Sequence, residues 1–172
     1  MKTAFNRRTV LLAAALGAGT TLLQACGGGD DEPQRNIVEL AKNTPELSIL
    51  VEAVVAAGLA STLQGTGPFT VFAPTNAAFA ALLTELGVSK ADLLANTALL
   101  TKVLTYHVVP ARVLKAEVPV NTAITTVQGQ TFTINSSLVI TDQNMRTSNI
   151  VAADVFTSNG VIHVVDKVIL PK

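Results

Sequence analysis

The hydrophobic pattern of the chain changes its period partway along, and this change most restricts the possible folds. Between Leu47 and Leu104, apolar residues recur every three or four positions, which is typical of helices with one buried face. Beyond Val108, apolar and β-branched residues form short runs or alternate with polar ones, which is typical of strands. Because helices cluster early and strands late, the sequence predicts an α+β fold with an antiparallel sheet.

Capping residues define the expected helices. One helix is predicted over 36–42, and another starts with Thr44 as N-cap and Pro45 in the first turn. The stripe of this second helix and its expected stop comprise Leu47, Leu50, Val51, Val54, Val55 and Gly58. Later helices are predicted from a stripe at Phe79, Leu82, Leu83 and Leu86 ended by Gly87, from a Ser89–Asp92 capping box, and from a cap at Asn96 or Thr97.

Strands are predicted over 70–73, 131–134, 138–141, 150–156 and 161–170. The last two are joined by Ser158, Asn159 and Gly160, and an Asn-Gly pair is a strong hairpin signal because both residues tolerate positive φ. We therefore expect Gly160 to occupy a positive-φ turn position, and replacement of Asn159 and Gly160 by β-branched residues to disrupt the last hairpin.

The N-terminus has the pattern of an export signal. Lys2, Arg7 and Arg8 precede the uncharged stretch 9–23, which is too short to span a bilayer but long enough for a signal peptide. The stretch ends in Leu23-Gln24-Ala25-Cys26, which resembles the lipobox of bacterial lipoproteins. We predict a signal peptide over 1–25 and lipidation of Cys26, with a free thiol as the alternative. The Arg7-Arg8 pair also resembles a twin-arginine signal, so the export route stays open.

Residues 26–35 follow as a Gly-rich, acidic segment, interpreted as a flexible lipidated tether before a domain at 36–172. The resulting expectation is a protein attached to the bacterial cell envelope, in the periplasm or on the extracellular face. An Asp after the lipidated Cys retains lipoproteins in the inner membrane of enterobacteria. Gly27 stands at that position, so the outer membrane is preferred.

Charge and composition exclude some functions. The chain has 12 basic and 12 acidic residues, and removal of residues 1–25 leaves nine basic and 12 acidic ones, a net charge of −3. With no basic excess, no Trp and one Tyr, a nucleic-acid partner is not expected. A single Cys excludes an internal disulfide.

Three segments together resemble the fasciclin (FAS1) domain family. The first is 67–79, with Pro74, Thr75 and Asn76 at its centre; the second is 104–110, with the pair Tyr106-His107. The third is 158–171, which contains Asn159, Gly160, His163 and Asp166. The resemblance covers 36–172. It implies a wedge of two β-sheets at an angle, with helices packed along one side.

Members of this family are secreted or membrane-anchored and mediate cell adhesion, matrix contact or surface attachment. The resemblance therefore implies a lipid-anchored binding module whose partner is a surface or matrix protein or a polysaccharide. The integrin-contact motifs of animal members have no clear match, the nearest candidate being 153–155. The alternative function is an envelope protein that binds a small ligand or polysaccharide in a concave pocket. We expect a monomer.

The pair Tyr106-His107 has two interpretations. As a functional pair it would form a contact site or a titrating switch, because His changes charge near pH 6.5. As a structural pair it would end a helix, with the ring hydrogen-bonded to backbone or to Tyr106. A Tyr or His among Leu and Val at helical spacing is more often a satisfied core group, which favours the structural interpretation.

No catalytic or metal-binding constellation stands out. His163 and Asp166 are three apart on a predicted strand, so they point to opposite faces and should not form a dyad. Asp166 is instead expected at a strand edge or paired with a backbone group. Thr75 and Asn76 are interpreted as a helix N-cap, with anion binding at that helix start as the alternative. The chain has two His and lacks phosphate-loop and hydrolase-elbow motifs, so neither enzyme activity nor a cofactor is expected.

Overall fold

The computed structural model describes residues 35–172. The predicted signal peptide, Cys26 and nearly all of the predicted tether lie outside the described residues. In chain order the elements are α1 (Ile37–Lys42), the 3₁₀ helix η1 (Pro45–Leu47), α2 (Ser48–Ala56), α3 (Ala60–Leu63), β1 (Phe69–Pro74), α4 (Asn76–Leu86), α5 (Lys90–Ala95), α6 (Thr97–Tyr106), β2 (Val108–Val109), the 3₁₀ helix η2 (Lys115–Glu117), β3 (Ala123–Thr125), β4 (Thr131–Ile134), β5 (Val139–Thr141), β6 (Thr147–Thr157) and β7 (Gly160–Val165). The α+β class is confirmed.

Local capping signals account for most helix ends. The Ser89–Asp92 box is confirmed at the start of α5, and Gly87 ends α4 with a left-handed φ of 65°. Thr44 stands at the expected N-cap position with Pro45 after it, but its side chain makes no capping bond, and the helix that begins there is η1, which precedes α2. Val55 is also wrongly placed in the core, since it is 58% exposed, whereas Ala53 is fully buried.

The seven strands of residues 35–172 form one sheet in the order β2-β1-β7-β6-β5-β4-β3. Neighbouring strands are antiparallel except for β1 and β7, which run parallel from Phe69 opposite Gly160 to Pro74 opposite Val165. The expectation of a purely antiparallel sheet is therefore wrong for this pair. The predicted last strand also stops early, because β7 ends at Val165 and residues 166–172 form no strand.

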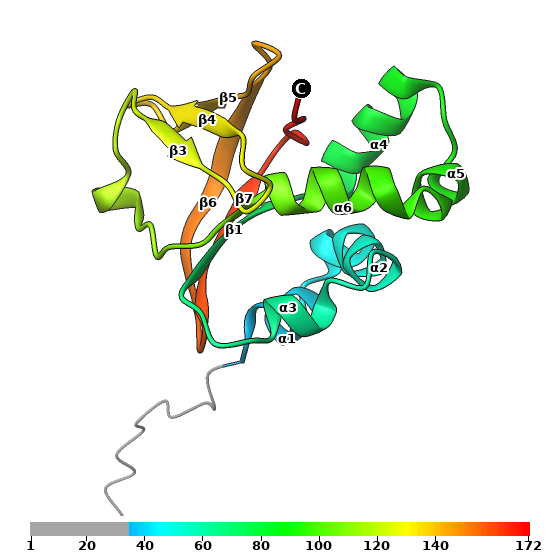
Figure 1. Ribbon diagram of the computed structural model, residues 1–172, viewed down its shortest axis with the longest axis horizontal. Helices are drawn as coiled ribbons and strands as arrows, with labels where there is room; N and C mark the ends of the chain where they lie inside the picture. Colours follow the sequence, from blue (N-terminus) through cyan, green and yellow to red (C-terminus); the bar gives the residue numbers. More distant parts are fainter. Residues whose placement is uncertain (1–34) are drawn as a thin grey trace, which may run out of the picture. The chain divides into compact units, whose positions relative to one another are not determined.

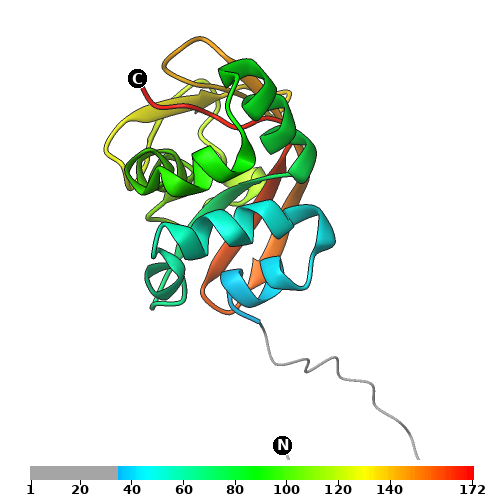
Figure 2. The same cartoon turned by 90° about the vertical axis from the view of Figure 1, so that its right-hand side faces the viewer.

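The sheet bends along β6, which explains how two predicted sheets can be continuous. β6 is 11 residues long and its pairing with β7 shifts register twice, between Ile150 and Ala152 and between Ala152 and Val155. The first residues of β6 pair with β5, and the rest of the strand pairs with β7, which in turn pairs with β1. Figures 1 and 2 show the helices gathered on one side of β1 and β7, with β3, β4 and β5 curling away from them.

Two hydrophobic clusters fill the domain. The first lies between the helices and the sheet and includes Phe79, Leu100 and Ile162. The second lies inside the curved part of the sheet, where the Phe72 and Phe132 rings meet edge to face with centroids 5.0 Å apart. Strand β1 contributes to both clusters, as do β7 and α6, so these elements join the helical half to the strand half.

Gly160 is needed for a reason other than the expected one. It does not have a positive φ, and because Thr157 pairs with Gly160, the turn is centred on Ser158 and Asn159. A Cβ atom on Gly160 would lie 2.0 Å from the carbonyl oxygen of Phe69. Similarly, a Cβ atom on Gly67 would lie 1.9 Å from the carbonyl oxygen of Asn159. Both glycines allow two backbones to meet where β1 and β7 begin.

This contact predicts a large effect for a single methyl group. Gly160→Ala should lower the free energy of unfolding by about 3 kcal/mol, since the backbone of β1 cannot move without breaking its ladder to β7. Ser158→Ala, in the same turn and exposed, is the matched control and should change stability by less than about 0.5 kcal/mol. Urea unfolding measures both, and equal midpoints for the two variants would contradict the assignment.

Candidate functional site

Both histidines of the chain are buried, and each joins two segments through its two ring nitrogens. His107 is 1% exposed and follows the last residue of α6, whereas His163 is fully buried in β7. They are brought to separate places, and no hydrogen bond connects them. Their partners, and those of the neighbouring motif residues, determine whether this region can act chemically.

His107 connects α6 to the end of the chain. Its Nδ1 lies 2.8 Å from the carbonyl oxygen of Val103, and its Nε2 accepts the backbone N–H of Ile169 at 3.2 Å. Because an N–H group can only donate, Nε2 carries no proton, and Nδ1–H donates to Val103. Burial of the ring lowers the pKa of His107 to about 4. The side chain is therefore neutral near pH 7, and its burial argues against an exposed switch that titrates near pH 6.5.

Tyr106 is buried beside it. Its hydroxyl group donates to the carbonyl oxygen of Thr131 at 2.8 Å, and its ring meets that of Phe132 edge to face at 6.0 Å. Burial, with a contribution from the carboxylate of Asp142, raises the pKa of Tyr106 to about 12. The Tyr106-His107 pair thus holds β4 and the C-terminal segment against α6, and neither side chain is available to a partner at the surface.

His163 holds a segment that crosses the sheet. Its Nε2 donates to the carbonyl oxygen of Val113 at 2.8 Å, and its Nδ1 accepts the N–H of Asp154 at 3.3 Å. The sequence did not predict this role. It also did not predict that of Thr70, whose Oγ1 donates to Ala111 at 2.6 Å and accepts the N–H of Val113 at 2.9 Å. The one available signal was that Thr70 is the single hydroxyl residue in an apolar strand.

Asp166 does not approach His163, in agreement with the expectation that they form no dyad. Its carboxylate accepts the backbone N–H of Asn149 at 2.7 Å and the hydroxyl of Ser148 at 3.2 Å. Partial burial opposes ionisation, but the hydrogen bonds from Asn149 and Ser148 outweigh it and lower the pKa of Asp166. The acid therefore ties the residue after β7 to β6.

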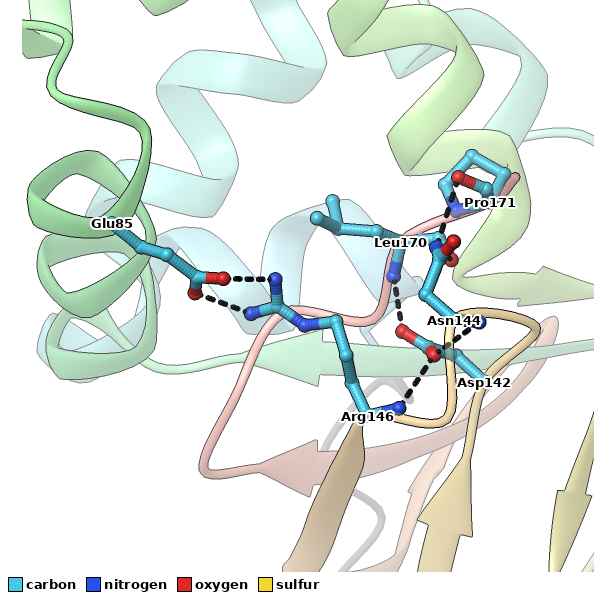
Figure 3. A network of polar contacts seen from close by, with 6 residues as sticks. All are labelled: Glu85, Asp142, Asn144, Arg146, Leu170 and Pro171. Atoms are coloured by element: carbon cyan, nitrogen blue, oxygen red, sulfur yellow. Dashed lines mark hydrogen bonds and ion pairs between the residues drawn. The ribbon is translucent and has the colours of Figure 1, made fainter.

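The buried acid Asp142 was missed by the sequence analysis. Its Oδ1 accepts the N–H groups of Asn144 and Arg146 at 2.8 and 2.9 Å, and its Oδ2 accepts that of Leu170 at 3.0 Å. Figure 3 shows how this turn, the C-terminal segment and α4 meet, with Arg146 bonded to both carboxylate oxygens of Glu85 at 2.5 and 2.6 Å. The one signal in the sequence for this arrangement was the position of Asp142 at the start of a turn.

The Pro74-Thr75-Asn76 turn leads β1 into α4. Thr75 is the N-cap and accepts the N–H of Ala78 at 3.2 Å. Asn76 does not cap α4; its side chain accepts the N–H of Ile49 at 3.0 Å and donates to the carbonyl oxygen of Pro45 at 2.9 Å. This amide therefore joins the start of α4 to the start of α2. With these partners in place, nothing at the helix start points to a bound anion.

Asn159 has a comparable role in the turn between β6 and β7. Its Nδ2 donates to the carbonyl oxygens of Leu63 and Gly65 at 2.7 and 3.0 Å, and its Oδ1 accepts the N–H of Ile37 at 3.1 Å. One amide thus connects the hairpin to the end of α3 and to the start of α1. The motif residue is used by the fold through side-chain bonds, not through a special backbone conformation.

The cavities of the described chain are small or open. The cavity beside His107 is about 30 Å³ and lined by apolar side chains such as Leu50 and Leu104, which leaves room for no more than one or two water molecules. An apolar groove of about 150 Å³ separates α4, α5 and α6 from the C-terminal residues. A polar hollow of about 460 Å³ lies between 64–68, Arg112 and 157–160.

Residues 35–172 contain neither a cluster of metal ligands nor a helix suited to a bilayer. No group of three or more Asp, Glu, His or Cys side chains in this part of the chain is placed to hold a metal ion. No helix within it combines the length and the apolar character needed to cross a membrane.

The fold and this site define an α+β domain whose polar motif residues are engaged in holding its own segments together. The chain belongs to the fasciclin domain family, whose model matches residues 45–171. It is 45% identical over 138 residues to the protein sll1483 of Synechocystis, which covers 78% of this chain and 73% of that protein. It is 36% identical over 149 residues to the immunogenic protein MPB70 of Mycobacterium bovis, which covers 80% of this chain and 70% of the relative.

Among solved structures, the fold is similar to that of a FAS1 domain pair from the insect cell adhesion molecule Fasciclin I. The TM-score is 0.68 at 16% sequence identity, and the similarity covers 79% of this chain and 51% of that one. At this identity the similarity shows the fold alone. The predicted family and its fold are confirmed.

The buried histidine predicts a defined dependence of stability on pH. In the unfolded chain His107 binds a proton below about pH 6.5, whereas in the folded protein it does so only below about pH 4. The contribution of neutral His107 to the free energy of unfolding is therefore complete above pH 6.5, and it decreases as the pH falls towards 4. The total loss should be about 3 kcal/mol, with a slope of up to about 1.4 kcal/mol per pH unit.

The matched variants are His107→Gln and Tyr106→Phe, with urea unfolding measured between pH 7 and 4. His107→Gln should remove most of this slope. Tyr106→Phe should keep the slope and cost about 1 kcal/mol, since the carbonyl oxygen of Thr131 still accepts a bond from Gln143. An unchanged slope in His107→Gln would contradict the assignment.

Asp166 affects stability in a separate pH range, below its ordinary pKa of 3.8.

Proposed function

We propose that this protein is an exported, lipid-anchored binding module that mediates adhesion or another surface interaction, without catalytic activity. The observation that carries this proposal is the use of the family motifs. Tyr106, His107, Asn159, His163 and Asp166 all bond to other segments of the domain. The motif side chains therefore stabilise the domain itself. A partner must then be bound by other parts of the exposed surface.

Family membership supports the same proposal. One fasciclin structure that shares this fold comes from a protein described as a cell adhesion molecule. The domain also carries exposed apolar side chains that a binding surface could use, among them Leu86 at 44% and Leu99 at 37%, which both line the groove between α4 and α6. The proposed partner is a surface or matrix protein or a polysaccharide.

The proposed location is the bacterial cell envelope, with the outer membrane preferred. The support comes from the sequence: the signal pattern of 1–25, the lipobox-like residues before Cys26, and Gly27 where an inner-membrane retention signal would have Asp. Two or three acyl chains hold a protein on a bilayer stably, so the domain needs no membrane-spanning helix.

A second function is favoured by one observation. The polar hollow of about 460 Å³ is large enough for a small ligand and is lined by hydroxyl and amide side chains such as Thr66, Ser158 and Asn159. A saccharide unit or another small polar molecule of the envelope could bind there. The cavity at His107, by contrast, is too small for such a ligand.

The anchor is tested with Cys26→Ala in the producing cell. The variant should move from the membrane fraction to the soluble fraction and lose labelling by a fatty-acid analogue, because the thiol that carries the lipid is gone. Ser61→Cys in the same background restores a thiol on an exposed helix and is the control; it should restore neither property. Unchanged membrane fractionation of Cys26→Ala would contradict lipidation.

Adhesion is tested by the retention of cells under flow on surfaces coated with matrix protein or with envelope polysaccharide. Cells that carry the anchored protein should be retained several-fold better than cells that lack it, because each attached domain adds one contact to a multivalent interaction. Cells with Cys26→Ala should resemble the cells without the protein. Equal retention of all three strains, together with binding of soluble oligosaccharide by the purified protein, would favour the second function.

A further inference from the structure

The described chain enters the domain at the turn between β6 and β7. The carbonyl oxygen of Arg35 accepts the N–H of Ser158 at 3.1 Å, and the N–H of Ile37 donates to Asn159 at 3.1 Å. These two bonds attach the first described residues to one end of the sheet. Arg35, from which the chain continues back towards Cys26, therefore lies against the β6–β7 turn.

The distance from Cys26 to this turn is limited by covalent geometry. Eight residues lie between Cys26 and Arg35, so the nine steps of chain that join them span at most about 30 Å. A domain with the length of residues 35–172 has a radius of gyration of roughly 14 Å, which corresponds to a diameter of roughly 37 Å. If Cys26 is held in a bilayer, the segment from Cys26 to Arg35 is shorter than the diameter of the domain. The β6–β7 turn therefore cannot lie on the side of the domain that faces away from the bilayer.

The opposite end of the domain is marked by the turn between β5 and β6. Strand β6 has 11 residues and extends about 36 Å at the usual rise per residue. Figure 1 shows it running from the β5–β6 turn to the β6–β7 turn. Met145 lies in the far turn and is 81% exposed. The two turns therefore provide one reference position at each end.

The end that carries the β6–β7 turn has the chemistry of a surface that meets lipid headgroups. The polar hollow lies here, and no acidic residue lines it; its one charged lining residue is Arg112. The guanidinium carbon of Arg112 lies 5.4 Å from the centroid of the Phe156 ring, which is 55% exposed. Phosphate is a strong acceptor for guanidinium and hydroxyl groups, and an exposed aromatic ring favours the boundary between water and acyl chains.

We propose that the β6–β7 end docks on the bilayer that holds lipidated Cys26. In this arrangement Arg112 and the hydroxyl groups of the hollow bind a lipid headgroup phosphate, and Phe156 lies at the interface. The inference rests on the proposed lipid anchor. It adds an orientation: the β5–β6 turn and the apolar groove near α4 face away from the membrane, towards a partner.

Docking is tested by distance in the full lipidated protein, reconstituted into vesicles of phosphatidylethanolamine and phosphatidylglycerol. A fluorophore is attached to Ser61→Cys, which is exposed on α3 beside the β6–β7 turn, or to Met145→Cys, since the thiol of Cys26 is blocked by its lipid. Energy transfer to an acceptor on the lipid headgroups should be strong from position 61 and weak from position 145. Equal transfer from the two positions would overturn the proposal.

The contact residues are tested by matched substitutions. Arg112→Gln and Phe156→Ser should each lower the ratio of docked to undocked protein, by about five-fold for the arginine, and the arginine effect should shrink at high salt. Arg146→Gln and Met145→Ser remove the same kinds of side chain at the far end and should leave the ratio unchanged. Equal effects of near-end and far-end variants would contradict the assigned surface.

Two further outcomes separate the anchor from the docking and the phosphate from the lipid surface. Protein that stays soluble after reconstitution shows that the anchor is wrong, whereas membrane-bound protein with equal transfer from both labels shows that only the docking is wrong. In vesicles of galactolipid, which lack phosphate, transfer from position 61 should fall, although the short connection to Cys26 still keeps this end of the domain near the bilayer. Full transfer there would overturn headgroup phosphate as the ligand.

Discussion

The close approach of two backbones at the start of β1 and β7 is the constraint on which the rest of the domain depends. Gly67 and Gly160 lie against the partner strand with no room for a Cβ atom. This contact starts the parallel pairing of β1 with β7 that continues for six residue pairs. Because β1 belongs to both hydrophobic clusters through residues such as Val71 and Phe72, the pairing determines how the helical half sits on the curved sheet.

Side chains hold two segments of the domain in place outside the pairing of regular strands. The segment that crosses the sheet after β2 is bonded by Thr70 and His163, and the C-terminal segment after β7 is bonded by His107 and Asp142. Each of these side chains is buried and makes at least two hydrogen bonds. Loss of one side chain would therefore leave buried backbone groups unpaired. Of these groups, His107 makes stability depend on pH, because its burial keeps the ring neutral down to about pH 4.

Because these side chains bond within the domain, a partner must be recognised by residues at the surface. Because Tyr106 and His107 are buried and bonded to the domain itself, they cannot also recognise a partner. What remains for recognition is a polar hollow beside Arg112 at the end where the chain enters, and an apolar groove lined by Leu86 and Leu99 between the helices. An anchor at Cys26 would give these two surfaces different neighbours, because the connection to Arg35 is shorter than the domain.

The sequence by itself determined the class of the domain, the family, and most helix ends and strand positions. These depend on periods of two or 3.6 residues and on caps such as Ser89 with Asp92, which act over three or four residues and can be read locally. Local patterns also excluded a His163–Asp166 dyad correctly, because alternation along a strand is a property of the strand alone.

Only the tertiary structure decided the parallel pairing of β1 and β7, the reason for Gly160, and the partners of the buried histidines. His163 meets a carbonyl group 50 residues away, and His107 meets an N–H group 62 residues away. No local pattern specifies such a pair, since the two groups come together only after the sheet and helices have packed. The residue types in the motifs were visible in the sequence, but what they bond to is a property of the folded chain.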